Sequence, residues 1–239
     1  MYNRITKINE LPDVVKNLLI INGLLFLATI SLNNIGIDLV KFLGLHQFQS
    51  ADFKPHQIIT HLFMHGSISH LLMNMFALWM FGKILENIWG AKRFLTYYII
   101  TGIGAAILHL LVSQYQIIQL SSEYPELFSI ALDGLYHKGN SESLKLTQLI
   151  LTPTVGASGA VFGILLAFGI LFPNTQLFLL FPPVPIKAKY FVIFYGLFEL
   201  YLGIMNNPND NVAHFAHLGG MLFGYLLLKY WQKNNTQFY

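Results

Sequence analysis

The feature that most constrains this chain is a series of apolar stretches, each about as long as a membrane is thick. A helix needs roughly 20 mostly apolar residues to cross the hydrocarbon core of a bilayer. Stretches of that kind recur along the 239 residues, of which 54% are apolar and 10% are charged. Because a soluble domain does not bury so much apolar surface, we predict a polytopic, all-α membrane protein forming one domain over residues 1–239.

Glycine, proline and polar residues divide the apolar stretches into six expected membrane-spanning helices. They are expected at about residues 17–32, 67–88, 94–118, 158–172, 189–205 and 212–231. A polar insertion at about 119–148 precedes the fourth helix. Pro173 ends the fourth helix. This short central helix barely spans a bilayer, so its N-terminus is expected below the membrane surface, among protein or water partners.

The distribution of basic residues predicts an orientation in the membrane. If the N-terminus is cytoplasmic, most of the 14 Lys and Arg residues fall on the cytoplasmic side, as the positive-inside rule requires. Both termini are then cytoplasmic. The same scatter, without a clustered basic stripe, argues against nucleic acid as a partner despite a pI near 9.0. The compact arrangement favours a bacterial cytoplasmic membrane, with an organelle as the alternative.

Four polar residues are expected at one depth near the outer side of the membrane. Ser158 begins the fourth helix, His217 lies early in the sixth, and His70 and Asn74 lie early in the second. Their four-residue spacing places His70 and Asn74 on one helical face. Polar side chains at such depth are costly unless they face a protein interior or a water-filled cavity, so they mark a candidate site.

The chemistry that these residues favour is acyl transfer. A serine hydroxyl is a poor nucleophile until a base takes its proton, and a buried neutral imidazole suits that task. His217 would be the base for Ser158. The negative charge of the tetrahedral intermediate would meet the Ser158 N–H and the side chains of Asn74 and His70. No acid is evident beside His217, so we expect a serine–histidine dyad without metal or cofactor; the absence of cysteine excludes thiolate chemistry.

Stripes of small residues on the fourth and sixth helices predict that these helices pack closely. The four-residue spacing of such stripes allows membrane helices to approach each other. The stripes are Gly159, Gly163 and Ala167 on the fourth helix, and Ala216, Gly220 and Gly224 on the sixth. Ser158 and His217 each neighbour the first member of a stripe, so close packing would bring the two side chains together.

These motifs resemble those of the rhomboid family of intramembrane serine proteases. The resemblance rests on Gly156-Ala157-Ser158-Gly159, on His70 with Asn74, and on Ala216-His217-Leu218-Gly219-Gly220. It implies that Ser158 is the nucleophile, His217 the base, and that His70, Asn74 and the Ser158 N–H form the oxyanion hole.

The resemblance also implies supporting residues and a substrate class. Gly156 and Gly159 would support the site, and Phe162 would stack on the catalytic histidine where other members often have tyrosine. His56-Gln57 stands where many members have Trp-Arg. Substrates would be transmembrane proteins reached through the lipid bilayer, with a gate formed by the fifth helix and residues 206–211.

Two other functions remain open at this point. The paired histidines His61 with His65 and His214 with His217 allow a metal enzyme of the histidine-box type, although such sites need many ligands at one level and an HExxH motif is absent. An inactive relative that binds membrane helices is the non-enzymatic alternative. Glu199, an acid within the fifth helix, is expected to hydrogen-bond a neighbour or to face water rather than to act in catalysis.

Overall fold

The computed structural model describes residues 11–138, 140–178, 184–205 and 212–234, and these are mostly helical, as predicted. The elements are α2 (Asp13–Asn33), α3 (Leu39–Leu43), α4 (Gln57–Thr60), η1 (His61–Phe63), α5 (Ile68–Ala77), η2 (Leu78–Gly82), α6 (Lys83–Trp89), α7 (Ala91–Glu123), α8 (Pro125–Leu132), α9 (Ser141–Leu151), α10 (Ser158–Leu171), β1 (Gln176–Phe178), β2 (Pro185–Lys187), α11 (Ala188–Met205) and α12 (His214–Asn234). Within the described ranges, the all-helical prediction is corrected by β1 and β2, which pair as a short antiparallel sheet.

Four helices in the described part of the chain are long and apolar enough to cross a membrane. They are Asp13–Asn33, Ile68–Trp89, Ala91–Glu123 and Ala188–Met205. The second of them is α5, η2 and α6, which follow one another without a break. α10 is apolar but has only 14 residues, which corresponds to roughly 21 Å of helix. The chain is thus a polytopic membrane protein, and the six crossings stay a prediction.

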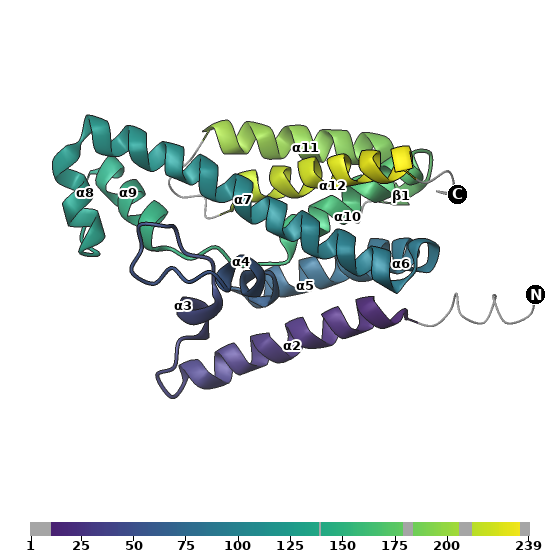
Figure 1. Cartoon of the computed structure of the whole chain (residues 1–239), viewed down its shortest axis with the longest axis horizontal. Coiled ribbons are helices and arrows are strands. Elements are labelled where there is room, and N and C mark those ends of the chain that lie inside the picture. The colour runs from purple at the N-terminus through teal and green to yellow at the C-terminus, as the bar shows by residue number, and fades with distance from the viewer. Residues whose placement is uncertain (1–10, 139, 179–183, 206–211, 235–239) are drawn as a thin grey trace, which may run out of the picture.

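The core of the molecule is formed by α7, α10 and α12, which pack against one another (Figure 1). Two glycines permit the closest approach, since a Cβ at Gly220 would overlap the backbone oxygen of Gly159. The later members of the two small-residue stripes contact α7 instead. A Cβ at Gly163, for example, would lie 2.7 Å from Thr101 of α7. The predicted packing of the stripes is therefore found at Gly159 and Gly220, and α7 packs on the rest.

The polar insertion predicted at 119–148 is largely helical in its described residues. α7 continues to Glu123, and α8 and α9 follow. The Asn140 side chain accepts a hydrogen bond from the Ser143 N–H at 2.7 Å and so caps α9. These helices share a small apolar cluster with the end of α7, formed by Ile117, Leu127, Ala131, Leu146 and Ile150. They lie at one end of the bundle, opposite the start of α2 and the end of α12 (Figure 1).

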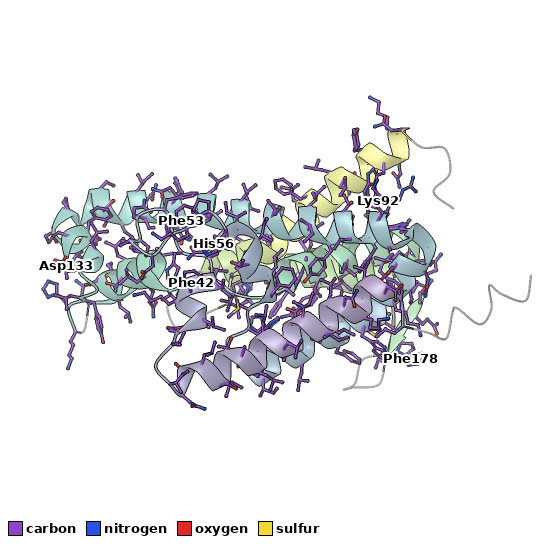
Figure 2. The ribbon with its side chains drawn as sticks, turned by 60° about the horizontal axis from the view of Figure 1, so that its bottom comes forward. Phe42, Phe53, His56, Lys92, Asp133 and Phe178 are labelled. Atoms are coloured by element: carbon purple, nitrogen blue, oxygen red, sulfur yellow. The ribbon has the colours of Figure 1, made fainter. Side chains whose placement is uncertain are left out.

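The segment between α2 and α5 is held by a buried glutamine. Gln57 accepts hydrogen bonds from the backbone N–H groups of His46 and Lys54 and donates to the carbonyl oxygen of Asp52 at 2.9 Å. The neighbouring His56 ring lies beside Phe42, with ring centroids 5.3 Å apart (Figure 2). His56 and Gln57 therefore anchor this segment through these contacts.

A buried carboxylate ties α6 to the N-terminus of α2. Glu86 is 4% exposed and accepts hydrogen bonds from the backbone N–H groups of Val14 at 2.9 Å and Val15 at 2.8 Å. Free N–H groups and the dipole at a helix N-terminus favour a negative charge there. Glu86 thus has a structural role far from the candidate site.

Candidate active site

The candidate nucleophile stands at the first position of α10. The preceding segment is fixed in space: Thr154 pairs with Leu45 through two backbone hydrogen bonds, and the Gly156 N–H donates to the His61 oxygen at 2.9 Å. Gly156 has a φ of +129°, a backbone conformation that residues other than glycine rarely adopt. This turn leads the chain into α10, so that the Ser158 hydroxyl lines a cavity and its N–H is left free of helical hydrogen bonds.

The structure brings His217 of α12 into contact with Ser158. His217 Nε2 lies 2.8 Å from Ser158 Oγ, and the histidine is buried. The Phe162 ring, one turn after the serine, stacks on the imidazole with centroids 4.1 Å apart and an angle of 6° between the planes. The two predicted catalytic side chains therefore meet at hydrogen-bond distance, and an aromatic face fixes the orientation of the imidazole.

An acid lies beside His217, so the expectation of none was wrong. Glu199 Oε2 of α11 is 2.8 Å from His217 Nδ1 and 2.7 Å from His214 Nδ1, and Glu199 is 4% exposed. Sequence reasoning noted Glu199 as an acid within a span but could not give the rotation of α11 against α12. His214, which the metal alternative paired with His217, is buried against this carboxylate; its three-residue spacing from His217 was the available signal.

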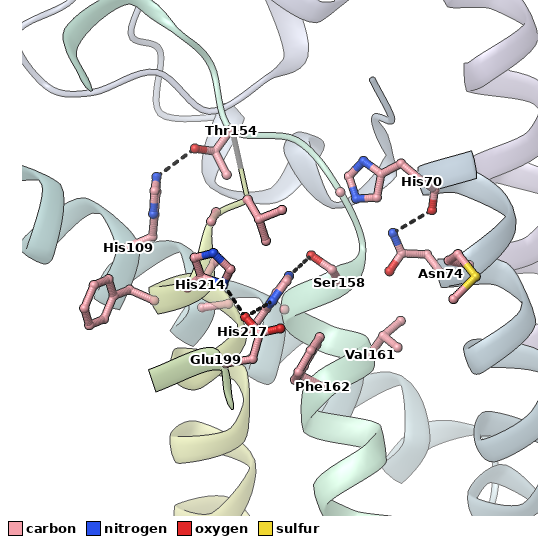
Figure 3. Close-up of a pocket in the computed structure, with 18 of the residues that line it drawn as sticks. His70, Asn74, His109, Thr154, Ser158, Val161, Phe162, Glu199, His214 and His217 are labelled. Atoms are coloured by element: carbon pink, nitrogen blue, oxygen red, sulfur yellow. Dashed lines mark hydrogen bonds and ion pairs between the residues drawn. The ribbon is translucent and has the colours of Figure 1, made fainter. Parts of the chain in front are cut away.

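His70 and Asn74 of α5 lie across Ser158 from His217 and Glu199 (Figure 3). Asn74 donates one amide hydrogen to the His70 backbone oxygen at 3.0 Å and retains the other. A Cβ on Gly156 would lie 2.7 Å from His70 Nε2 and 3.6 Å from Ser158 Oγ. The absence of a side chain at residue 156 therefore leaves room between the serine and the imidazole of His70.

The site opens into a cavity of about 1450 Å³. Apolar side chains from several helices line it, among them Met73 and Phe76 of α5 and Phe191 and Phe198 of α11. Cavities for small ligands are typically 300–1,000 Å³, so this one is large enough for a segment of polypeptide. Its lining suits an apolar chain with a few polar groups at one end.

One group of described residues has the spacing of metal ligands: Glu199, His214 and His217. Two ligands of one tetrahedral zinc ion lie about 3.3 Å apart, because each bond is about 2.0–2.1 Å long. The Glu199 oxygen is 2.7 and 2.8 Å from the two imidazole nitrogens, which is the length of a hydrogen bond. The arrangement as it stands thus fits a hydrogen-bonded carboxylate better than a metal site.

The other histidine pair of the metal interpretation does not join this group. His61 Nδ1 lies 2.8 Å from the Gln57 oxygen, and burial lowers the pKa of His61 to about 4. Burial, with the neighbouring His70, likewise lowers the pKa of His65 to about 4. Both rings are therefore neutral at physiological pH and lie in the segment before α5 rather than in the group at Glu199.

Comparison with known proteins decides the family. The family model described as "Rhomboid domain" matches residues 52–233. The chain belongs to the rhomboid family. This rhomboid is 30% identical over 188 residues to Rhomboid protein 1, mitochondrial, of Saccharomyces cerevisiae. The matched region covers 78% of the chain and 45% of the yeast protein. It is 29% identical over 174 residues to Rhomboid protease AarA of Providencia stuartii, which covers 70% of the chain and 52% of that protein.

A further relative is RHOMBOID-like protein 12, mitochondrial, of Arabidopsis thaliana, 28% identical over 211 residues, or 87% of the chain and 55% of the plant protein. The rhomboid chain thus spans about half the length of the curated relatives it matches. Because the yeast and plant relatives are named as mitochondrial, the predicted bacterial cytoplasmic membrane is not supported. The candidate spans support an integral membrane protein.

Proposed function

We propose that this rhomboid is a serine endopeptidase that hydrolyses peptide bonds in or near the transmembrane segments of other membrane proteins. Ser158 is the nucleophile and His217 is the general base. The observation that carries the proposal is the 2.8 Å distance between Ser158 Oγ and His217 Nε2 inside a cavity of a membrane protein. Family relatives named as proteases, such as AarA, favour the same activity.

The first chemical step follows from the orientation of the two side chains. The Ser158 hydroxyl donates its hydrogen bond to His217 Nε2, which takes the proton as Oγ attacks the carbonyl carbon of the substrate. The stacked Phe162 ring holds the imidazole in line with the serine. The step creates a tetrahedral intermediate with negative charge on the former carbonyl oxygen.

The negative charge on that oxygen is stabilised by hydrogen-bond donors. The free N–H of Ser158 at the start of α10, the remaining amide hydrogen of Asn74 and the His70 ring supply them. The protonated His217 then gives its proton to the leaving amine, which leaves an acyl-enzyme on Ser158. Water, deprotonated by His217, hydrolyses this ester and restores the serine hydroxyl. Gly156 and Gly159 support this geometry by allowing His70 and α12 to approach.

The proposed substrate is a membrane-embedded helix that unwinds locally. Helical carbonyl groups are hydrogen-bonded and shielded, so the scissile bond must leave the helix before attack. The apolar cavity walls of α5 and α11 suit the side chains of such a segment. The proposal includes one domain over 1–239, six crossings and both termini on the cytoplasmic side; the 206–211 part of the implied gate lies outside the described residues.

The test is proteolysis of a single-span reporter protein in liposomes by purified wild type, Ser158→Ala and His217→Ala. Each substitution should lower kcat by at least about 1,000-fold, because each removes a group that acts only in the transition state. Ser121→Ala is the control, since that hydroxyl bonds only carbonyl oxygens of its own helix. Substantial activity in either dyad variant would contradict the proposal, and loss of activity on chelation would favour the metal enzyme.

A further inference from the structure

His217, the base of the proposed dyad, lies beside a buried carboxylate and a second histidine. One oxygen atom, Glu199 Oε2, lies within hydrogen-bond distance of Nδ1 of both His217 and His214. The three side chains are buried, and the two imidazole rings meet edge to face with centroids 6.4 Å apart. The acid comes from α11 and both histidines come from α12, so the contact joins two helices (Figure 3).

We propose that Glu199 is a positioning residue for the catalytic base, so that the site works as a serine–histidine–glutamate triad rather than as a dyad. The inference rests on the proposed protease function and adds a third residue to it. Its basis is the placement of a buried carboxylate on the imidazole nitrogen that faces away from the serine.

The carboxylate determines which tautomer His217 adopts. An ionised carboxylate only accepts hydrogen bonds, so Nδ1 of His217 must carry the hydrogen that Glu199 binds. The neutral ring then has a free lone pair on Nε2, the atom 2.8 Å from Ser158 Oγ. Only this tautomer can accept the serine proton. Without Glu199 the ring can also hold its hydrogen on Nε2, and that form cannot act as the base.

The same carboxylate opposes the charge that appears during the reaction. When Ser158 transfers its proton, His217 becomes an imidazolium inside a poorly solvated cavity, which is costly without a nearby negative charge. Glu199 provides that charge at 2.8 Å. Because the helix pair already holds the carboxylate in place, little reorganisation is needed as the charge develops.

His214 holds the carboxylate in this position. A buried carboxylate needs hydrogen-bond donors to offset its lost hydration, and one donor would leave Glu199 free to rotate. The His214 Nδ1–H, 2.7 Å from Oε2, is the second donor. His214 therefore acts on the base through Glu199 and does not touch the reacting serine.

Kinetics of Glu199 variants test the proposal. Glu199→Gln should lower kcat by at least about 100-fold with KM changed less than about threefold, because the amide can donate to His217 and permit the wrong tautomer. Glu199→Asp, which keeps the carboxylate, should recover activity to within about tenfold of wild type.

Glu86→Gln is the matched control, because Glu86 is also a carboxylate of 4% exposure that accepts two hydrogen bonds, but from the backbone of α2. It should lower the thermal midpoint without changing kcat of the folded enzyme. If Glu199→Gln behaved like Glu86→Gln, with a lowered midpoint and unchanged kcat, Glu199 would be structural only and the proposal would be overturned.

A spectroscopic measurement separates positioning from general damage. In protein labelled with ¹⁵N-histidine, the ring signals missing from His217→Asn belong to His217. Wild type should show hydrogen on Nδ1, and Glu199→Gln should show a mixture of tautomers. Hydrogen on Nε2 in wild type would contradict the proposal. Failure of the protease function itself is distinguishable, because wild type would then be inactive whatever tautomer is seen.

Discussion

At the scale of the residue, the turn before the nucleophile depends on the absence of one side chain. Gly156 has a φ of +129°, and a Cβ there would lie 2.7 Å from the His70 ring on the side that faces Ser158. A side chain at this position would both strain the backbone and fill the place proposed for the oxyanion. The site thus needs glycine for conformation and for space.

Gly156→Ala should therefore lower kcat by at least about 100-fold, a loss comparable to removing an oxyanion donor, through displacement of His70. Gly66→Ala is the control in the neighbouring loop, since its Cβ would meet only Val155, at 3.9 Å. Peptidase activity and the thermal midpoint are measured for both. A Gly156→Ala enzyme with wild-type kcat would show that the space beside Ser158 is not used in the reaction.

The contacts of the site that the sequence predicts depend on different structural features from the contact that it does not predict. Ser158 and His217 could be placed together because they lie near the starts of two helices with matching small-residue stripes, and the family resemblance added Phe162. The contact of Glu199 with His217 depends on how α11 is rotated against α12. An isolated sequence carries no signal for that rotation, so the acid was recognised as unusual and its partner was not.

At the scale of the element, the site is held together by the close approach of α10 and α12. A Cβ on Gly220 would overlap the backbone oxygen of Gly159, the residue next to the nucleophile. Backbone atoms cannot move aside as a flexible side chain can, so any larger residue at 220 must push the helices apart. The distance from Ser158 to His217 depends directly on this crossing.

Gly220→Ala should destabilise the protein by about 2 kcal/mol, in the range of overpacked cores, and lower activity further than the loss of folded protein explains. Gly23→Ala is the control: it lies in α2, and its Cβ would meet nothing within 4 Å. Thermal midpoints and activity per folded molecule are compared. Equal behaviour of the two variants would contradict the role given to the α10–α12 crossing.

The structure has α10 at Ser158–Leu171, beside the expected 158–172, where the apolar run ends near Pro173. The insertion was the exception, because the polar composition of 119–148 hides α8 and α9. Their stability comes from packing on the end of α7 through Leu127, Leu146 and Ile117, a tertiary contact that composition does not reveal.

At the scale of the whole molecule, the ends of the bundle differ in what they carry. Lys92 and Phe178 lie toward one end and Asp133 toward the other, with α8 and α9 (Figure 2). The start of α2 and the end of α12 lie at the end opposite the insertion (Figure 1). The proposed orientation would place this shared end of α2 and α12 on the cytoplasmic side and the insertion on the outer side.

The most direct measurement of the central claim is covalent labelling of the membrane-reconstituted protein with a fluorophosphonate, followed by mass mapping of the modified residue. The reagent reacts with a serine only when a neighbouring base activates it. The account predicts one modified residue, Ser158, and loss of the label in His217→Ala. Labelling at another serine, or undiminished labelling of Ser158 without His217, would contradict it.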